Sequence, residues 1–144
     1  MQRYKIKIEY EGTSFVGWQF QKNGQSVQEV LQKAIFNFSK ENVTVTGAGR
    51  TDSGVHALAQ VAHFDLKKKI QKKNLLSAIN QNISNKSVTV LKINRVNKNF
   101  HARQALKLHL LFLTRHVFQL LLYRDDAFCI PIFCRGIKLC LQLL

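Results

Sequence analysis

The stretch VTVTGAGRTDSGVHALAQVAHFDL, residues 43–66, decides the fold. It begins with VTVTG, which is rich in β-branched residues, and it ends with QVAHFDL, which has the composition of a second strand. Between them, Gly47, Gly49 and Gly54 permit a tight or positive-φ backbone, so the chain turns there. The sequence therefore predicts two consecutive strands joined by a loop, with no helix between them.

The segments on either side extend this pair into a domain. YKIKIEY, residues 4–10, alternates apolar and charged residues as a half-buried strand does. Ser26 and Glu29 have the spacing of a capping box that opens a helix. NLLSAINQNI and SVTVLKINRV predict a second helix and a last strand. The residues expected to point inward are Tyr4, Ile6, Ile8 and Tyr10 in the first strand, Val27, Val30, Leu31, Ala34, Ile35 and Phe38 in the first helix, and Leu75, Leu76 and Ile79 in the second.

The resulting order, β-α-β-β-α-β, predicts an α+β fold of the ferredoxin-like type, an antiparallel sheet with helices on one face. A length of 144 residues suits one domain, and a hydrophobic content of 46% is enough for a core. The net charge of +14 indicates a polyanionic partner, most often nucleic acid. The alternative is that this charge only solvates the surface.

The N-terminus has no apolar core of a signal peptide, and no apolar run approaches the roughly 18 residues that span a bilayer. We therefore expect a cytoplasmic protein with no membrane segment. Cys129, Cys134 and Cys140 do not have a zinc spacing and are interpreted as reduced thiols, so no metal site is expected.

The composition changes near residue 103. Residues 104–144 contain twelve leucines and all three cysteines, with no steady period of a helix or a strand. We interpret residues 1–103 as the folded part and residues 104–144 as an aberrant tail, most simply the product of a frameshift. The alternative is a genuine leucine-rich helical segment that binds a partner.

Arg50 and Asp52 lie on the glycine-flanked loop, directly after a predicted strand. A loop braced by a rigid sheet is a suitable place for chemistry. A carboxylate held there beside a guanidinium is able to act as a nucleophile or a base toward an RNA substrate. The alternative is that Asp-Ser-Gly is an ordinary turn, in which Asp52 bonds only to the backbone.

Five motifs together decide between these alternatives. GAGRTDSGVHA, with YEGTSFVGWQFQ, SVQEVLQKAI, QVAHFD and FHAR, resembles the bacterial tRNA pseudouridine synthase A family, in the family's order over residues 1–103. The resemblance implies that the chain isomerises uridine to pseudouridine in the anticodon stem-loop of tRNA, with no metal or organic cofactor. It implies that Asp52 is the catalytic residue, that tRNA is the partner and that the protein is a homodimer.

The resemblance also implies roles for residues around Asp52. Arg50 is expected to hold the flipped site open and to pair with Asp52, and Thr51 and His56 are expected to contact the substrate. Arg103 corresponds to the end of the family's F-H-A-R strand and is expected to contact phosphate or the active site, unless it is only an exposed strand cation. His56 and His63 are alternatively structural, and Trp18 either stacks on RNA or anchors a loop. The lysines at positions 67, 68, 69, 72 and 73 either attract phosphate or form a solvated face.

The resemblance ends after Arg103. The family continues with an R-x-Y-x-Y stretch whose tyrosine lines the uracil pocket, whereas this chain has Leu110 at about that position. The family's second half has no counterpart here, so the chain is expected to be a truncated member whose own activity is open. A non-catalytic RNA-binding module of the same topology is the alternative function. An interaction fragment that docks through its leucine-rich tail is a third reading.

Overall fold

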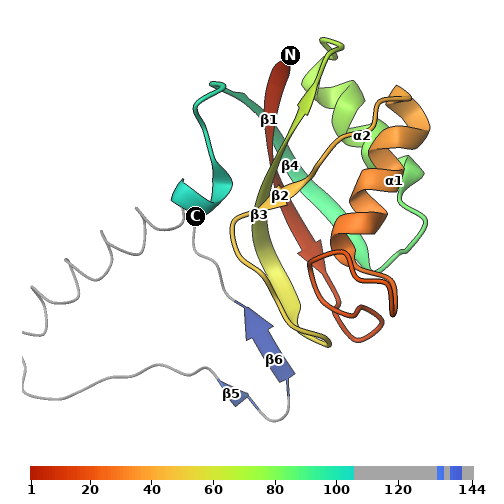
Figure 1. Ribbon diagram of the computed structural model, residues 1–144, viewed down its shortest axis with the longest axis vertical. Coiled ribbons are helices and arrows are strands. Elements are labelled where there is room, and N and C mark those ends of the chain that lie inside the picture. Colours follow the sequence, from red (N-terminus) through yellow and green to blue (C-terminus); the bar gives the residue numbers. More distant parts are fainter. Residues whose placement is uncertain (106–132, 135–136, 141–144) are drawn as a thin grey trace, which may run out of the picture.

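The structure is a computed structural model that describes residues 1–105, 133–134 and 137–140. Figure 1 shows a sheet with two helices packed against one of its faces. The elements, in chain order, are β1 (Gln2–Tyr10), α1 (Val27–Ser39), β2 (Thr46–Gly47), β3 (His56–Leu66), α2 (Lys72–Asn82), β4 (Val88–Val96), β5 (Phe133–Cys134) and β6 (Ile137–Cys140).

The order of the first six elements confirms the predicted β-α-β-β-α-β arrangement. Strand β1 lies between β4 and β3 and is antiparallel to both, and the short β2 pairs with the second half of β3. Strand β6 lies parallel to the first two residues of β3. We call the side of the sheet that faces away from α1 and α2 the open face (Figure 1).

The core lies between the sheet and the helices, as the alternation in the sequence predicts. Tyr4, Ile6 and Ile8 are fully buried, and they pack against the apolar faces of both helices. Phe38 and Leu76 are only partly buried and pack at the margin of this core. Burial of each large apolar side chain stabilises the fold by about 1.5–3 kcal/mol, so loss of any one of these side chains would weaken the core.

Helix α1 begins where the capping spacing predicts. The Oγ of Ser26 accepts a hydrogen bond from the backbone N–H of Glu29 at 3.2 Å. The Glu29 carboxylate does not complete a reciprocal box, because it forms an ion pair with Lys33 at 2.6 Å, one turn along the helix. The helix ends at Lys40, whose φ of 59° is left-handed and whose N–H bonds to the carbonyl of Phe36.

The predicted strand at residues 43–47 is shorter than expected, because β2 contains only Thr46 and Gly47. Side chains of α1 form hydrogen bonds with the backbone just before β2. The Oε1 of Gln32 accepts from the N–H of Val45 at 3.1 Å, and the Nε2 of Gln28 donates to its carbonyl at 2.8 Å. A strand partner is therefore replaced by two glutamines of the neighbouring helix.

The F-H-A-R segment is not a strand, contrary to expectation. Residues 102–105 form a helical turn, in which the N–H of Ala105 bonds to the carbonyl of His101 at 3.0 Å. Residues 97–100 form a turn before it, closed by the N–H of Phe100 and the carbonyl of Asn97 at 2.9 Å. The two turns keep this segment from continuing β4, and it crosses the open face instead.

Most of the predictions for residues 104–144 fall outside the described residues, since only residues 104–105 and two short strands of that segment are described. Leu110 and the nature of the tail belong to this untested part. Within the described residues, neither helix has the length and apolar character needed to cross a membrane.

Candidate active site

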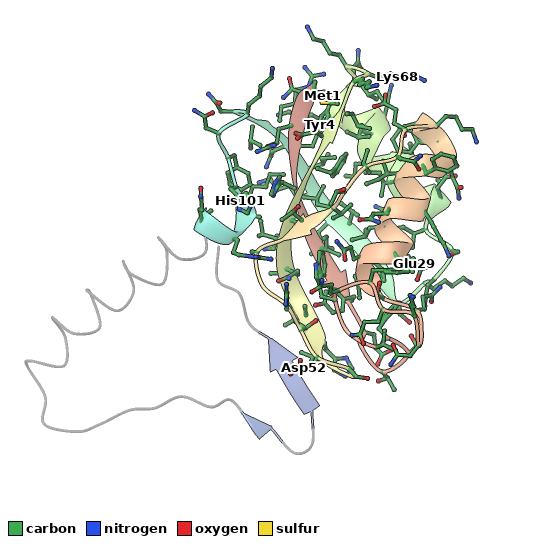
Figure 2. All side chains as sticks on the ribbon, in the orientation of Figure 1. Met1, Tyr4, Glu29, Asp52, Lys68 and His101 are labelled. Atoms are coloured by element: carbon green, nitrogen blue, oxygen red, sulfur yellow. The ribbon has the colours of Figure 1, made fainter. Side chains whose placement is uncertain are left out.

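The loop that carries Arg50 and Asp52 lies at the end of the sheet where β1 ends and β3 begins. Figure 2 shows Asp52 at this end and Lys68 at the opposite one. Both Arg50 and Asp52 are exposed, whereas Thr51 between them is half-buried. The side chains of Arg50 and Asp52 therefore face solvent, while the residue between them is partly enclosed by the fold.

One set of contacts to this loop comes from residues 12–18, the glycine-rich loop that follows β1. The N–H of Trp18 donates to the carbonyl of Thr51 at 3.0 Å, and the Oγ of Ser53 donates to the carbonyl of Phe15 at 3.1 Å. Gly17 has a φ of 116°, and a Cβ at this position would lie 2.5 Å from the Thr51 carbonyl oxygen. Only glycine permits this approach, so the two loops interlock through their backbones.

A second set of contacts comes from the sheet. The hydroxyls of Tyr10 and Thr51 are hydrogen-bonded at 2.9 Å, and the Nε2 of Gln60 donates to the carbonyl of Gly49 at 2.8 Å. Sequence reasoning missed both anchors. The signal for Gln60 was available, because a glutamine interrupts the apolar residues on the core face of β3, where it is fully buried. A buried amide is kept where it bonds to a backbone group that would otherwise have no partner.

Trp18 is an anchor of the loop and does not offer a stacking surface. Its side chain is 3% exposed, and its ring lies 6.2 Å from that of Tyr10. The same indole covers Gly47, where a Cβ would come within 2.6 Å of the ring. Of the two roles considered for Trp18, the structure supports the loop anchor.

The ion pair that the resemblance implies between Arg50 and Asp52 is not formed. The ion pairs among residues 1–105 join Arg3 to Asp65 and Lys33 to Glu29, and the contact of His56 with Glu11 is an ion pair only where the imidazole is protonated. An exposed pair contributes only about 0–1 kcal/mol, too little to hold two solvated side chains together. Within residues 1–105 the Asp52 carboxylate makes no hydrogen bond, although its main-chain carbonyl accepts from the N–H of Val55 at 3.3 Å. The carboxylate thus remains open to a ligand.

His56 lies on the sheet side of the loop, beside a groove. Its Nδ1 is 3.4 Å from the N–H of Gly12 and 3.6 Å from the Glu11 carboxylate. Hydrogen bonds from Thr13 lower the pKa of Glu11, and the charge of His56 adds a smaller effect in the same direction. The groove has a volume of about 410 Å³ and is lined by Glu9, Tyr10, Glu11, His56, Leu58, Lys86, Ser87 and Thr89. His56 lines this groove, whereas Asp52 does not.

The F-H-A-R segment and the residues just before it are attached to the open face at three points. The Nη1 of Arg3 donates to the carbonyls of Lys98 at 2.6 Å and Phe100 at 2.8 Å. The N–H of Ala102 donates to the Nδ1 of His63 at 3.3 Å, and His63 is 5% exposed, so this histidine is structural. Figure 2 shows His101 on the side of the sheet away from the helices.

The same segment brings Arg103 toward the loop. Ala102 is fully buried and packs in one small cluster with Val61 and Ala48, and Ala48 is the second residue of the motif that carries Asp52. Arg103 follows Ala102 directly and is exposed. Arg103 therefore lies on a helical turn, next in sequence to a residue that packs with Ala48.

The basic run at residues 67–73 lies away from the loop, at the other end of β3 (Figure 2). The backbone N–H groups of Lys67 and Lys68 donate to the Glu41 carboxylate at 2.8 and 3.2 Å. These bonds lower the pKa of Glu41, the bond from Lys67 first. No three His, Cys, Asp or Glu side chains of the described residues are grouped to hold a metal ion.

Comparison with known proteins agrees with this arrangement. Residues 6–103 match the sequence profile of a family described as tRNA pseudouridine synthase. The chain is 52% identical over 106 residues to the tRNA pseudouridine synthase A of Ehrlichia ruminantium strain Gardel, covering 73% of this chain and 43% of the relative. It is 50% identical over 108 residues to that of Pelagibacter ubique, covering 74% and 44%, and 42% identical over 132 residues to that of Anaplasma phagocytophilum, covering 90% and 51%. The chain thus spans about half the length of these relatives.

Proposed function

The chain belongs to the tRNA pseudouridine synthase family, and on this premise we propose that it acts in the isomerisation of uridine to pseudouridine in tRNA, with Asp52 as the catalytic carboxylate. One observation carries the proposal. The Asp52 carboxylate is exposed and has no partner among residues 1–105, while the residues on either side of it are held, Thr51 by the N–H of Trp18 and Ser53 by the carbonyl of Phe15. A free acid on an ordered loop meets the geometric demand of a catalytic group, because little ordering remains to be done when the substrate binds.

The proposed reaction uses that carboxylate without a cofactor. The bond between N1 of the uracil and C1′ of the ribose breaks, the base turns, and C5 bonds to C1′. C5 then loses its proton and N1 carries one, so the product is an isomer of the substrate. An ionised carboxylate can serve such a sequence as a nucleophile or as a base.

The neighbouring residues take supporting roles in this proposal. The target uridine must leave its stack to reach Asp52, and the exposed Arg50 is placed to occupy the space it leaves and to contact phosphate. Thr51 positions the loop through the hydroxyl of Tyr10. His56 contacts the substrate from the neighbouring groove, and Arg103 contacts phosphate from its helical turn. In this proposal the partner is tRNA and the chain acts in the cytoplasm, and two copies pair, as the resemblance implies.

A tritium-release assay tests this proposal. When C5 of a [5-³H]uridine in tRNA bonds to C1′, the tritium passes to water and can be counted. Release by the 144-residue chain that is lost in Asp52→Ala, but kept in Glu29→Gln, which changes a half-buried carboxylate of α1 that pairs with Lys33, supports the proposal. RNA binding without any release from the parent chain overturns it and favours a non-catalytic RNA-binding module.

A further inference from the structure

Three lysines, Lys5, Lys7 and Lys92, are gathered on the open face of the sheet. Lys5 and Lys7 alternate with the buried Ile6 and Ile8, so their side chains leave the face opposite the helices. Lys92 belongs to β4 and is the register partner of Lys7. Together with Val61 and Asn94, these three line a groove of about 160 Å³. We call Lys5, Lys7 and Lys92 the lysine strip.

The lysine strip places like charges directly across from one another. Directly opposed residues of an antiparallel pair have Cβ atoms about 4.5–5.5 Å apart, and like charges there destabilise the sheet. The register partners of Lys5 are His63 and Asn94, and the other partner of Lys7 is Val61, so no carboxylate faces either lysine across the sheet.

A neighbouring pair on the same face shows the contrasting arrangement. Arg3 and Asp65 are register partners, and they form a two-pronged ion pair with distances of 2.8 and 2.7 Å. At this position, opposite charges on neighbouring strands form an ion pair that stabilises the sheet. No ion pair joins a carboxylate to any member of the lysine strip within residues 1–105. The uncompensated charge is more readily explained by an external anion than by the needs of the fold.

The position of the strip indicates which anion it binds. The F-H-A-R segment crosses the same face, and the Nζ of Lys5 lies 5.5 Å from the ring centroid of Phe100. The same segment continues to Ala102, which packs on Ala48 at the start of the Asp52 loop. A polyanion that reaches that loop over the open face therefore passes the lysine strip. The groove offers ammonium groups and an amide but no exposed apolar anchor of the kind that protein partners fill.

We propose that the lysine strip is a phosphate-binding surface that contacts the tRNA backbone away from the uridine held at Asp52. The inference rests on the proposed function and extends its substrate site to three further residues. Lysine ammonium groups bind phosphates as point charges, and each such contact releases counterions, so binding through the strip depends on salt.

The test compares two triple variants of equal net charge. Lys5→Gln, Lys7→Gln and Lys92→Gln remove the strip, and Lys69→Gln, Lys72→Gln and Lys73→Gln remove three exposed lysines that follow the C-terminal end of β3. Affinity for a fluorescein-labelled tRNA transcript is measured by anisotropy between 50 and 200 mM KCl, conditions over which roughly one unit of slope is expected for each lysine–phosphate contact.

We expect the strip variant to bind at least about tenfold more weakly at the low-salt end and to reduce the slope of log K against log salt by roughly 2–3. The control variant should change the slope by less than about one. A strip variant with all three lysines changed to arginine should keep the parent slope, which separates loss of charge from loss of fold. Equal slopes for the two glutamine variants would overturn the inference. So would polyglutamate that displaces the labelled tRNA from the parent chain as effectively as unlabelled tRNA does.

Tritium release on the same preparations keeps this inference apart from the proposed function. Release with an unchanged salt slope in the strip variant would leave the catalytic proposal intact and remove the phosphate surface. A reduced slope in the strip variant with no release from the parent would do the reverse.

Discussion

The backbone N–H of Ala102 donates a hydrogen bond to the Nδ1 of His63 at 3.3 Å, and this bond attaches the F-H-A-R segment to the open face of the sheet. Both residues are buried, at 0% and 5% exposed. A nitrogen that accepts a hydrogen bond carries no proton, so the imidazole of His63 must be neutral, with its proton on Nε2. The attachment of this segment is therefore sensitive to pH.

The first prediction concerns acid destabilisation through His63. Burial lowers the pKa of His63, and the nearby positive charges of Arg3 and His101 lower it further against the opposing effect of Asp65. Its register partners are Lys5 on β1 and the uncharged Thr46 on β2. Because the folded pKa lies below the usual 6.5, the unfolded chain binds more protons between the two values. Stability is then fully present above about pH 6.5 and decreases as the pH falls through that range.

The measurement is the melting temperature by circular dichroism at pH 7.5 and pH 5.5. His63→Asn keeps an acceptor near the position of Nδ1 but does not titrate, so it should show a smaller drop between the two pH values than the parent. An equal drop in both proteins would contradict the role of His63.

The second prediction concerns the ion pair that holds the same segment from β1. Arg3 donates to both oxygens of Asp65 and to the carbonyls of Lys98 and Phe100. Arg3→Met should destabilise the fold by about 1–3 kcal/mol, since it leaves a carboxylate and two carbonyls without their donor. Asp65→Asn should have a smaller effect, because the carbonyl bonds remain. Urea unfolding of both single variants and the double variant measures the coupling, and strictly additive effects would contradict a shared network.

The third prediction concerns the interlocked loops. Gly17→Ala places a Cβ 2.5 Å from the Thr51 carbonyl oxygen at a φ of 116° and should destabilise the fold by more than about 1 kcal/mol. Gly54→Ala is the matched control, because Gly54 also has a positive φ, of 75°, but a Cβ there meets nothing within 4 Å. Urea unfolding should rank Gly17→Ala well below Gly54→Ala, and equal losses would mean that the close approach to Thr51 is not required.

The fourth prediction separates order in the loop from global stability. Gln60→Leu removes the amide that bonds to the Gly49 carbonyl, while it adds apolar volume at a fully buried position. The melting temperature should change little, because the lost bond contributes about 1 kcal/mol and the added burial offsets it. Hydrogen exchange of the amides at residues 50–53 should become faster. Unchanged exchange in these amides would contradict the role of Gln60 as an anchor.

The sequence was sufficient to predict the elements that depend on local pattern. Alternation in residues 4–10 gave the correct face of β1, and Ser26 gave the start of α1 to the residue. Three features were not predictable in this way, because each depends on contacts between distant residues. Gln28 and Gln32 of α1 replace a strand partner at Val45, Arg3 and His63 hold the F-H-A-R segment as a turn, and Gly47 accepts the indole of Trp18.

The candidate site also has features that local sequence signals predict and features that depend on contacts between distant residues. The motif was sufficient to indicate an exposed aspartate on a braced loop, since glycines and a preceding strand are local signals. The expected pair between Arg50 and Asp52 is absent, because neighbours in sequence on an exposed loop gain too little from pairing to be held together. The anchors Tyr10 and Gln60 come from two strands that adjoin the loop only in the folded chain.

The most direct test of the central claim is the pseudouridine content of tRNA after incubation with the parent chain or with Asp52→Asn, measured by nucleoside chromatography. Asparagine keeps the size of the side chain and loses only the charge and basicity of the carboxylate. We expect pseudouridine from the parent and at least about a hundredfold less from the variant, with an unchanged melting temperature. Equal yields from the two proteins would contradict a catalytic role for Asp52.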